Sequence, residues 1–176
     1  MLLQHARSSR LVATLLALVA VGLPGCTSYR VSELGYGPLK IGMTVDQASR
    51  ALNVALQPTG QPQSDDGGCY FVYPKGRAER MGFMLSGGTV ARIDVLEPGV
   101  LTAEGVGVGS TEADVKAAYG PGLEITGHKY TWMEGGHYLI AEPRPGSKLV
   151  FETDGSKVIT YRAGRVPEVE YVEGCR

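Results

Sequence analysis

The sequence predicts an α+β fold made of two tandem units, each a short helical layer packed on an antiparallel β-sheet. Two observations support this prediction. A helix-start pattern occurs twice, and similar strand and turn patterns follow it in the same order both times. We expect a signal peptide over residues 1–25, a tether over 26–34, the first unit over 35–99, and the second unit with a C-terminal strand over 100–176.

Each predicted helix starts at a threonine that can cap it. Gln47 stands three residues after Thr44, and Asp114 stands three residues after Thr111. At this spacing the threonine hydroxyl and the side chain three residues later each accept a hydrogen bond from a backbone N–H that has no partner within the helix. Apolar residues then recur at helical spacing. Two residues that commonly end helices stand at matching places, Asn53 and Gly120.

The two halves match again behind these helices. Residues 67–72 align with residues 135–140, and the turns at 86–88 and 154–156 occupy corresponding places. Both turns are typical of hairpins, because glycine readily takes the positive φ that a short hairpin loop needs. We therefore expect at least three antiparallel strands behind each helix.

The first residues indicate export and a lipid anchor. Arg7 and Arg10 precede an apolar run over residues 11–23, which has the length of a secretion signal and is too short to span a bilayer. The Leu-Pro-Gly sequence ahead of Cys26 resembles a bacterial lipobox, which implies acylation of Cys26 and a membrane partner. Thr27 in place of an aspartate implies the outer membrane, with the periplasmic face preferred to the surface. The alternative is an ordinary secretory signal cleaved nearby.

Two further cysteines are available for a disulfide. With Cys26 assigned to lipid, Cys69 and Cys175 remain in an oxidising compartment and can form one intramolecular bond. This bond would join the first unit's sheet to the end of the chain. The alternatives are two free thiols or an intermolecular bond. The preceding segment, residues 166–173, alternates like a strand.

The composition indicates no catalytic set, cofactor or metal. Removing the signal removes two arginines and no acidic residue, so the mature chain is mildly acidic and lacks the basic stripe of a nucleic-acid-binding protein. No serine lies in a nucleophile elbow, and no Cys/His pair is available for a thiolate site. His128 and His137 could meet across a hairpin and bind a metal, but no third ligand is indicated, and we expect His137 at a sheet edge. We therefore predict a protein that is not an enzyme.

One aromatic segment distinguishes the second half from the first. Residues 127–133 alternate and predict an extra strand with Tyr130 and Trp132 on one face. We expect this face to be buried, because a lone tryptophan in a small domain is usually packed. If the face is exposed, it can anchor a protein interface, and the candidate protein-binding residues are then Tyr130, Trp132, His137 and Tyr138.

The segment Ile41-Gly42-Met43-Thr44 and the helix after it resemble the SmpA/OmlA (BamE-like) outer-membrane lipoproteins. The tandem arrangement also resembles the β-lactamase inhibitory protein. The sequence departs from the first family in having two units, with Ser110 in place of Met43 in the second. The resemblance implies a non-enzymatic envelope lipoprotein that serves as a protein-binding scaffold or outer-membrane assembly accessory. The alternative is a periplasmic inhibitor or immunity protein that blocks a hydrolase. Neither family supplies a binding residue that maps onto this sequence.

Overall fold

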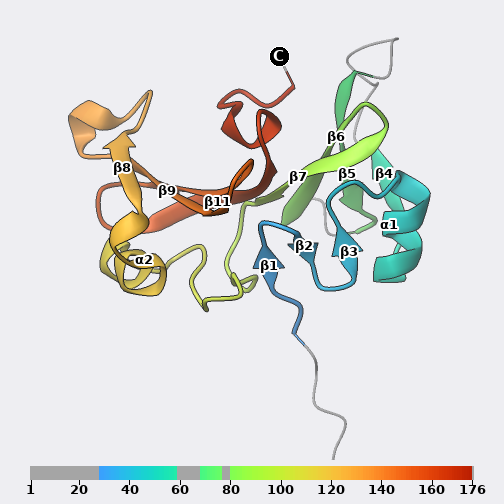
Figure 1. Cartoon of the computed structure of the whole chain (residues 1–176), viewed down its shortest axis with the longest axis horizontal. Helices are drawn as coiled ribbons and strands as arrows, with labels where there is room; N and C mark the ends of the chain where they lie inside the picture. Colours follow the sequence, from blue (N-terminus) through green and yellow to red (C-terminus); the bar gives the residue numbers. More distant parts are fainter. Residues whose placement is uncertain (1–27, 59–67, 77–79, 176) are drawn as a thin grey trace, which may run out of the picture.

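The structure is a computed structural model that describes residues 28–58, 68–76 and 80–175 (Figure 1). The predicted signal peptide and Cys26 lie outside these residues, so the lipid anchor stays a prediction.

The described residues form two antiparallel sheets and two short α-helices. The larger sheet has eight strands in the order β4-β5-β6-β7-β11-β10-β9-β8, and the smaller has three in the order β1-β2-β3. The strands of the larger sheet are β4 (Leu56–Pro58), β5 (Cys69–Pro74), β6 (Met81–Ser86), β7 (Thr89–Val95), β8 (Glu124–Gly127), β9 (His137–Arg144), β10 (Ser147–Thr153) and β11 (Val158–Arg165). Those of the smaller sheet are β1 (Val31–Ser32), β2 (Gly35–Tyr36) and β3 (Leu39–Lys40). The helices are α1 (Val45–Leu52) and α2 (Glu112–Tyr119), with 3-10 turns η1 (Gly120–Gly122), η2 (Trp132–Glu134) and η3 (Glu168–Glu170).

The predicted division into two α+β units, each with its own sheet and helical layer, is wrong. The described chain is mostly β, and its main strands form one undivided sheet. The physical reason is the antiparallel pairing of β7 with β11, in which Ile93 lies opposite Ala163 and Arg92 opposite Gly164. A side chain at Gly164 would place its Cβ 2.3 Å from the carbonyl oxygen of Ala91, so glycine allows the two backbones to approach closely at this junction.

Both helices begin where the sequence predicts. In α1, Gln47 N–H donates to Thr44 Oγ1 (3.4 Å), and Thr44 N–H donates to Gln47 Oε1 (2.9 Å). In α2, the same pair of bonds joins Thr111 and Asp114 at 3.1 and 2.8 Å. The predicted helix ends are also confirmed, because Asn53 and Gly120 have φ of 51° and 71°. Each helix has only eight residues, too few to form a continuous second layer over the sheet.

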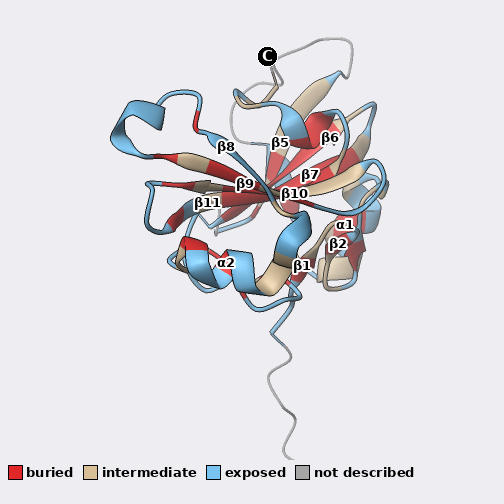
Figure 2. Ribbon diagram, turned by 60° about the vertical axis from the view of Figure 1, so that its left-hand side comes forward, coloured by how far each residue is buried: buried red, intermediate tan, exposed pale blue. Residues whose placement is uncertain are grey.

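The core lies between the large sheet and the elements on one of its faces. Figures 1 and 2 show α1, α2 and the small sheet on this face, and η3 with the C-terminal residues on the other. Val31 of β1 is fully buried here, although the sequence places it in a tether. The side chains that fill this core come from both helices and both sheets, and include Leu39, Ala48, Phe83, Ile93, Val115, Leu139, Phe151 and Tyr161.

The end of the chain is not the strand that the sequence predicts over residues 166–173. After β11 the chain turns at the cis peptide bond Val166–Pro167, forms η3 and crosses the second face of the sheet. Pro167 has no N–H to donate to a strand, and β11 already pairs with β7 and β10 on its two sides. We call residues 166–175 the C-terminal strap.

Candidate functional site

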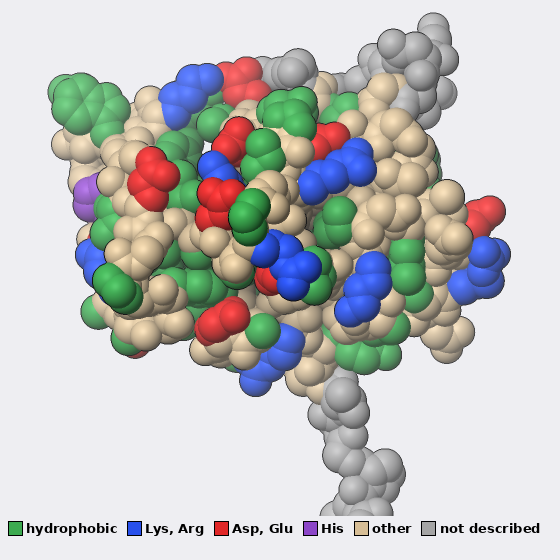
Figure 3. Space-filling model, in the orientation of Figure 1, with side chains coloured by type: hydrophobic (Ala, Val, Ile, Leu, Met, Phe, Trp, Pro, Cys, Tyr) green, Lys and Arg blue, Asp and Glu red, His purple; other side chains and the backbone are tan. Residues whose placement is uncertain are grey.

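The loop between β8 and β9, residues 128–136, contains the most exposed aromatic and apolar side chains of the second half. Tyr130, Trp132 and Met133 are 58%, 63% and 81% exposed. The expected burial of Tyr130 and Trp132 is therefore wrong, as is the predicted strand over 127–133. The strand β8 ends at Gly127, and the following residues form a turn that projects beyond the sheet. In Figure 3, apolar side chains protrude at the upper left, where Figure 1 places this loop.

A buried histidine organises the base of this loop. His128 N–H donates to Gly136 O (2.9 Å), and His128 O accepts from Trp132 N–H (3.0 Å), so the loop is closed by backbone bonds. On the imidazole, Nδ1 accepts from the N–H groups of Tyr130 (3.2 Å) and Thr131 (3.3 Å). Because Nδ1 accepts, the ring proton is on Nε2, which lies 3.2 Å from Glu152 Oε2. The loop therefore presents Trp132 from a fixed backbone.

Glu152 connects this histidine to a network of buried charges. It also accepts a hydrogen bond from Nη1 of Arg162, whose Nε donates to the carbonyl oxygen of Val169 (2.7 Å). The His128 ring stacks on that of Tyr138 at 4.5 Å, and the Arg162 guanidinium lies 5.8 Å from the same ring. Tyr138 is 8% exposed and supports the loop from below, so it does not contribute to the surface as the sequence suggests.

A second buried arginine holds the C-terminal strap at its centre. Arg92 Nε and Nη2 donate to the two oxygens of Asp94 at 2.9 and 2.8 Å, and Nη1 donates to the carbonyl oxygens of Glu168 (3.0 Å) and Tyr171 (2.6 Å). Burial raises the pKa of Asp94 above its usual range, and the hydrogen bonds and charge of Arg92 only partly oppose that effect. Carbonyl oxygens of the strap thus accept hydrogen bonds from an arginine side chain, whereas those of a strand would accept them from backbone N–H groups.

The ends of the strap join the two halves of the sheet. Cys175 is disulfide-bonded to Cys69 on β5, which is the pairing that the sequence predicts. Glu173 accepts a hydrogen bond from Lys129 Nζ (3.1 Å) and another from the Tyr130 hydroxyl, both in the β8–β9 loop. The strap therefore ties β5 at one side of the sheet to the exposed loop at the other.

His137 takes part in a separate cluster on the helical face. Its Nδ1 lies 2.8 Å from Glu112 Oε1, which also accepts a hydrogen bond from the Thr153 hydroxyl (2.6 Å). Burial raises the pKa of Glu112, but the hydrogen bonds from Thr153, His137 and Lys116 outweigh it and bring the pKa below its usual range. The predicted position of His137 at a sheet edge is wrong, because β9 lies between β8 and β10.

The two histidines do not meet, because neighbouring residues of β10 bind them on opposite faces of the sheet. The carboxylate of Glu152 contacts the His128 ring, and the hydroxyl of Thr153 accepts a hydrogen bond from the backbone N–H of His137. Successive side chains of a strand point to opposite faces of the sheet. Within residues 28–58, 68–76 and 80–175, no three His, Cys, Asp or Glu side chains are grouped so that they could hold a metal ion. None of the helices in these same residues has the length and apolar character needed to cross a bilayer.

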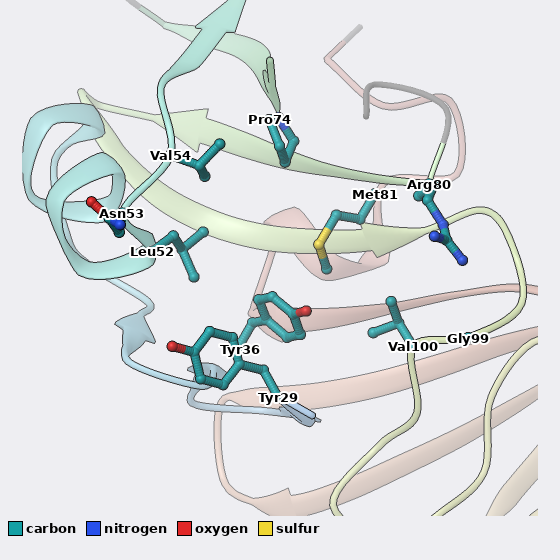
Figure 4. Close-up of a pocket in the computed structure, with 10 residues that line it drawn as sticks. All are labelled: Tyr29, Tyr36, Leu52, Asn53, Val54, Pro74, Arg80, Met81, Gly99 and Val100. Carbon is teal, nitrogen blue, oxygen red and sulfur yellow. The ribbon is translucent and has the colours of Figure 1, made fainter. Parts of the chain in front are cut away.

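A cavity of about 450 Å³ lies between the small sheet, the end of α1 and the loop after β7 (Figure 4). In Figure 4, the side chains of Tyr36, Leu52 and Met81 point toward a common space, with Arg80 at one end. The lining residues are Tyr29, Tyr36, Leu52, Asn53, Val54, Pro74, Arg80, Met81, Gly99 and Val100.

The sequence analysis missed the cavity and the two arginines that hold the strap. Only the arginines could have been recognised from the sequence. The cavity combines residues from six separate segments, so no local pattern could reveal it. The arginines left a readable signal, because Arg92, Asp94 and Arg162 interrupt otherwise apolar strands and occupy one face of the sheet. Buried charges of opposite sign at such positions predict a paired network.

Comparison with known proteins gives a fold likeness and no family. No protein-family model matches the chain, and no curated protein matches it. The fold is similar to the crystal structure of the uncharacterized protein YfeY from Escherichia coli, with 19% sequence identity and a TM-score of 0.51. The match covers 77% of this chain and 99% of that chain. At this identity the likeness concerns the fold alone, and membership of the SmpA/OmlA lipoproteins stays a prediction.

Proposed function

We propose that this protein is a non-enzymatic lipoprotein of the bacterial envelope, anchored through Cys26, that binds another protein with the β8–β9 loop. The observation that carries the proposal is the exposure of Trp132 on a loop whose backbone is fixed by His128. Aromatic residues that are both exposed and rigid contribute large contact area at low entropic cost, and they dominate the binding energy of many interfaces.

The position of the loop favours a protein partner over the bilayer. The described chain begins at Ser28, two residues after Cys26, so an acylated Cys26 would keep Ser28 within about 7 Å of the membrane surface. In Figure 1 the chain enters from below, beside the small sheet, and the β8–β9 loop lies at the upper left. The anchor would therefore direct the small sheet toward the membrane and present Trp132 away from it.

The anchor is tested first. Metabolic labelling with radioactive palmitate should label the wild-type chain and fail to label Cys26→Ser. Equal labelling of the two chains, or no labelling of either, would contradict acylation of Cys26 and the orientation that depends on it.

The binding surface is tested by photo-crosslinking in intact cells. A photoreactive amino acid at Met133 should capture a defined envelope protein, whereas the same group at Ile159 should not, although Ile159 is also exposed. Trp132→Ala should weaken capture by about 30-fold or more, which corresponds to the loss of about 2 kcal/mol typical of an aromatic anchor. If Trp132→Ala captures the same protein as efficiently as the wild type, the loop is not the binding surface.

A further inference from the structure

The wall of the cavity beside the small sheet combines apolar and polar groups in similar measure. Leu52, Met81 and Val100 contribute aliphatic or thioether groups, and the rings of Tyr29 and Tyr36 meet edge to face with their centres 5.5 Å apart. Its volume of about 450 Å³ lies within the range of about 300–1,000 Å³ found for small-molecule sites.

A cation stands at one end of this cavity. The Arg80 side chain is 49% exposed, and its Nη2 donates to the carbonyl oxygen of Pro98 (3.1 Å). Glu97 lies 3.9 Å from Arg80 Nε, beyond hydrogen-bond distance, and is itself half exposed. An exposed pair with this geometry contributes little stability, so an incoming anion can compete for the guanidinium.

The backbone allows Arg80 to take this position. Gly99 has φ of +104°, and a Cβ there would lie 2.9 Å from Arg80 Nη2. A side chain at this position would be strained and would displace the guanidinium. The cavity thus combines apolar wall groups with a cation held at its edge.

From this arrangement we infer that the cavity binds the acyl chain of an anionic amphiphile, with the acidic head group on Arg80. The apolar groups of the wall would contact the acyl chain and shield part of it from water, and the guanidinium offers paired N–H donors that match a carboxylate or phosphate. Tyr29 lies three residues after Cys26, so under the proposed anchor the cavity faces the membrane, where such amphiphiles are concentrated. The placement rests on the proposed function, whereas the chemistry of the cavity does not.

The test uses the full chain reconstituted in nanodiscs of zwitterionic phospholipid. A diazirine-bearing palmitate is crosslinked by light, and mass spectrometry locates the labelled peptides. We expect saturable labelling of the peptides that contain Leu52, Met81 and Val100, displaced by palmitate. Arg80→Gln should weaken labelling by the acid at least tenfold and leave labelling by a diazirine-bearing hexadecanol unchanged.

The matched control is Arg144→Gln. Arg144 is 56% exposed and pairs with Glu33 at 3.3 Å, outside the cavity, so its loss should not change labelling. A second arm uses a diazirine-bearing anionic phospholipid in the nanodisc. If only this lipid labels the cavity, with the same dependence on Arg80, the amphiphile comes from the bilayer and not from free acid.

Two results would overturn the inference. One is labelling that spreads over the surface without saturation in both arms. The other is equal labelling of Arg80→Gln and Arg144→Gln by every anionic probe. Failure of the proposed function is distinguishable, because it appears as loss of Cys26 acylation or as partner capture that Trp132→Ala leaves unchanged.

Discussion

Arg92 provides the most direct test of how the C-terminal strap is held. The substitution Arg92→Met keeps most of the side-chain volume and removes four hydrogen bonds, two to Asp94 and two to strap carbonyls. The Arg92 side chain is 5% exposed, so Asp94 would be left as a buried carboxylate without its partner. Breaking a buried pair in this way costs about 3–5 kcal/mol, out of a typical total stability of about 5–15 kcal/mol. The melting temperature should therefore fall by about 6–20 °C.

The destabilisation should depend on pH in a defined direction. Burial raises the pKa of Asp94, and Arg92 lowers it, so the pKa rises further when Arg92 is removed. A carboxyl whose pKa is higher in the folded than in the unfolded state lowers the unfolding free energy when it is ionised. This destabilisation decreases as pH falls and is absent below the unfolded pKa of about 3.9, where the carboxyl is protonated in both states. The difference in unfolding free energy between wild type and Arg92→Met should therefore be larger at pH 7 than at pH 4.

Urea denaturation followed by far-ultraviolet circular dichroism measures this difference. Trp132 fluorescence is the wrong probe for global unfolding, because that side chain is exposed on the loop. Arg144→Met is the control, since the Arg144 side chain is 56% exposed and makes an ion pair with Glu33, so its loss should cost much less than the loss of the buried Arg92. Adding Asp94→Asn to Arg92→Met should recover part of the loss. An Arg92→Met chain within 1 kcal/mol of wild type at pH 7, or a difference that grows toward pH 4, would refute the reasoning.

Three further predictions concern local features. Thr111→Ala and Thr44→Ala should each lower the unfolding free energy by about 1 kcal/mol, the usual cost of a lost helix cap, and a loss well below that in urea titrations would argue against the capping boxes. Because the pKa of Glu112 is lowered in the folded state, it stabilises the fold above the unfolded value of about 4.3, and this stability is lost as pH falls below it. The stability curves of wild type and Glu112→Gln should therefore converge toward low pH, and parallel curves would contradict this. Replacing Cys69 and Cys175 together by alanine opens a link across 106 residues and should cost about 2–5 kcal/mol in the same titrations, whereas an unchanged midpoint would show that the arginines hold the strap unaided.

The features that the sequence predicted correctly depend on local geometry. A threonine and the side chain three residues later can satisfy each other without regard to the rest of the chain, so the starts of α1 and α2 follow from Thr44 and Thr111. The same holds for the hairpin between β6 and β7, where Gly87 and Gly88 both have positive φ. The pairing of β7 with β11 is different, because alternating strands look the same whether they end one sheet or continue it.

The loop was misread for a related reason. Its residues alternate, but the N–H groups of Tyr130 and Thr131 donate to the His128 ring instead of a neighbouring strand. The pattern of apolar and polar residues does not show that a buried imidazole will accept hydrogen bonds from two backbone N–H groups. The predicted strand over these residues is therefore wrong, and the exposure of Trp132 follows from the turn that replaces it.

The continuous sheet has a consequence for how the two proposed surfaces act. Two separate units could shift relative to each other. Here β7 and β11 are paired as neighbouring strands, and at Gly164 their backbones approach too closely for a side chain. The strap adds a covalent link and buried arginine contacts across the same junction. A junction held in this way keeps the cavity beside β1 and the β8–β9 loop in a fixed relation. Occupancy of the cavity would therefore leave the affinity of the loop for its partner unchanged, because this junction offers the two surfaces no alternative arrangement for a ligand to select.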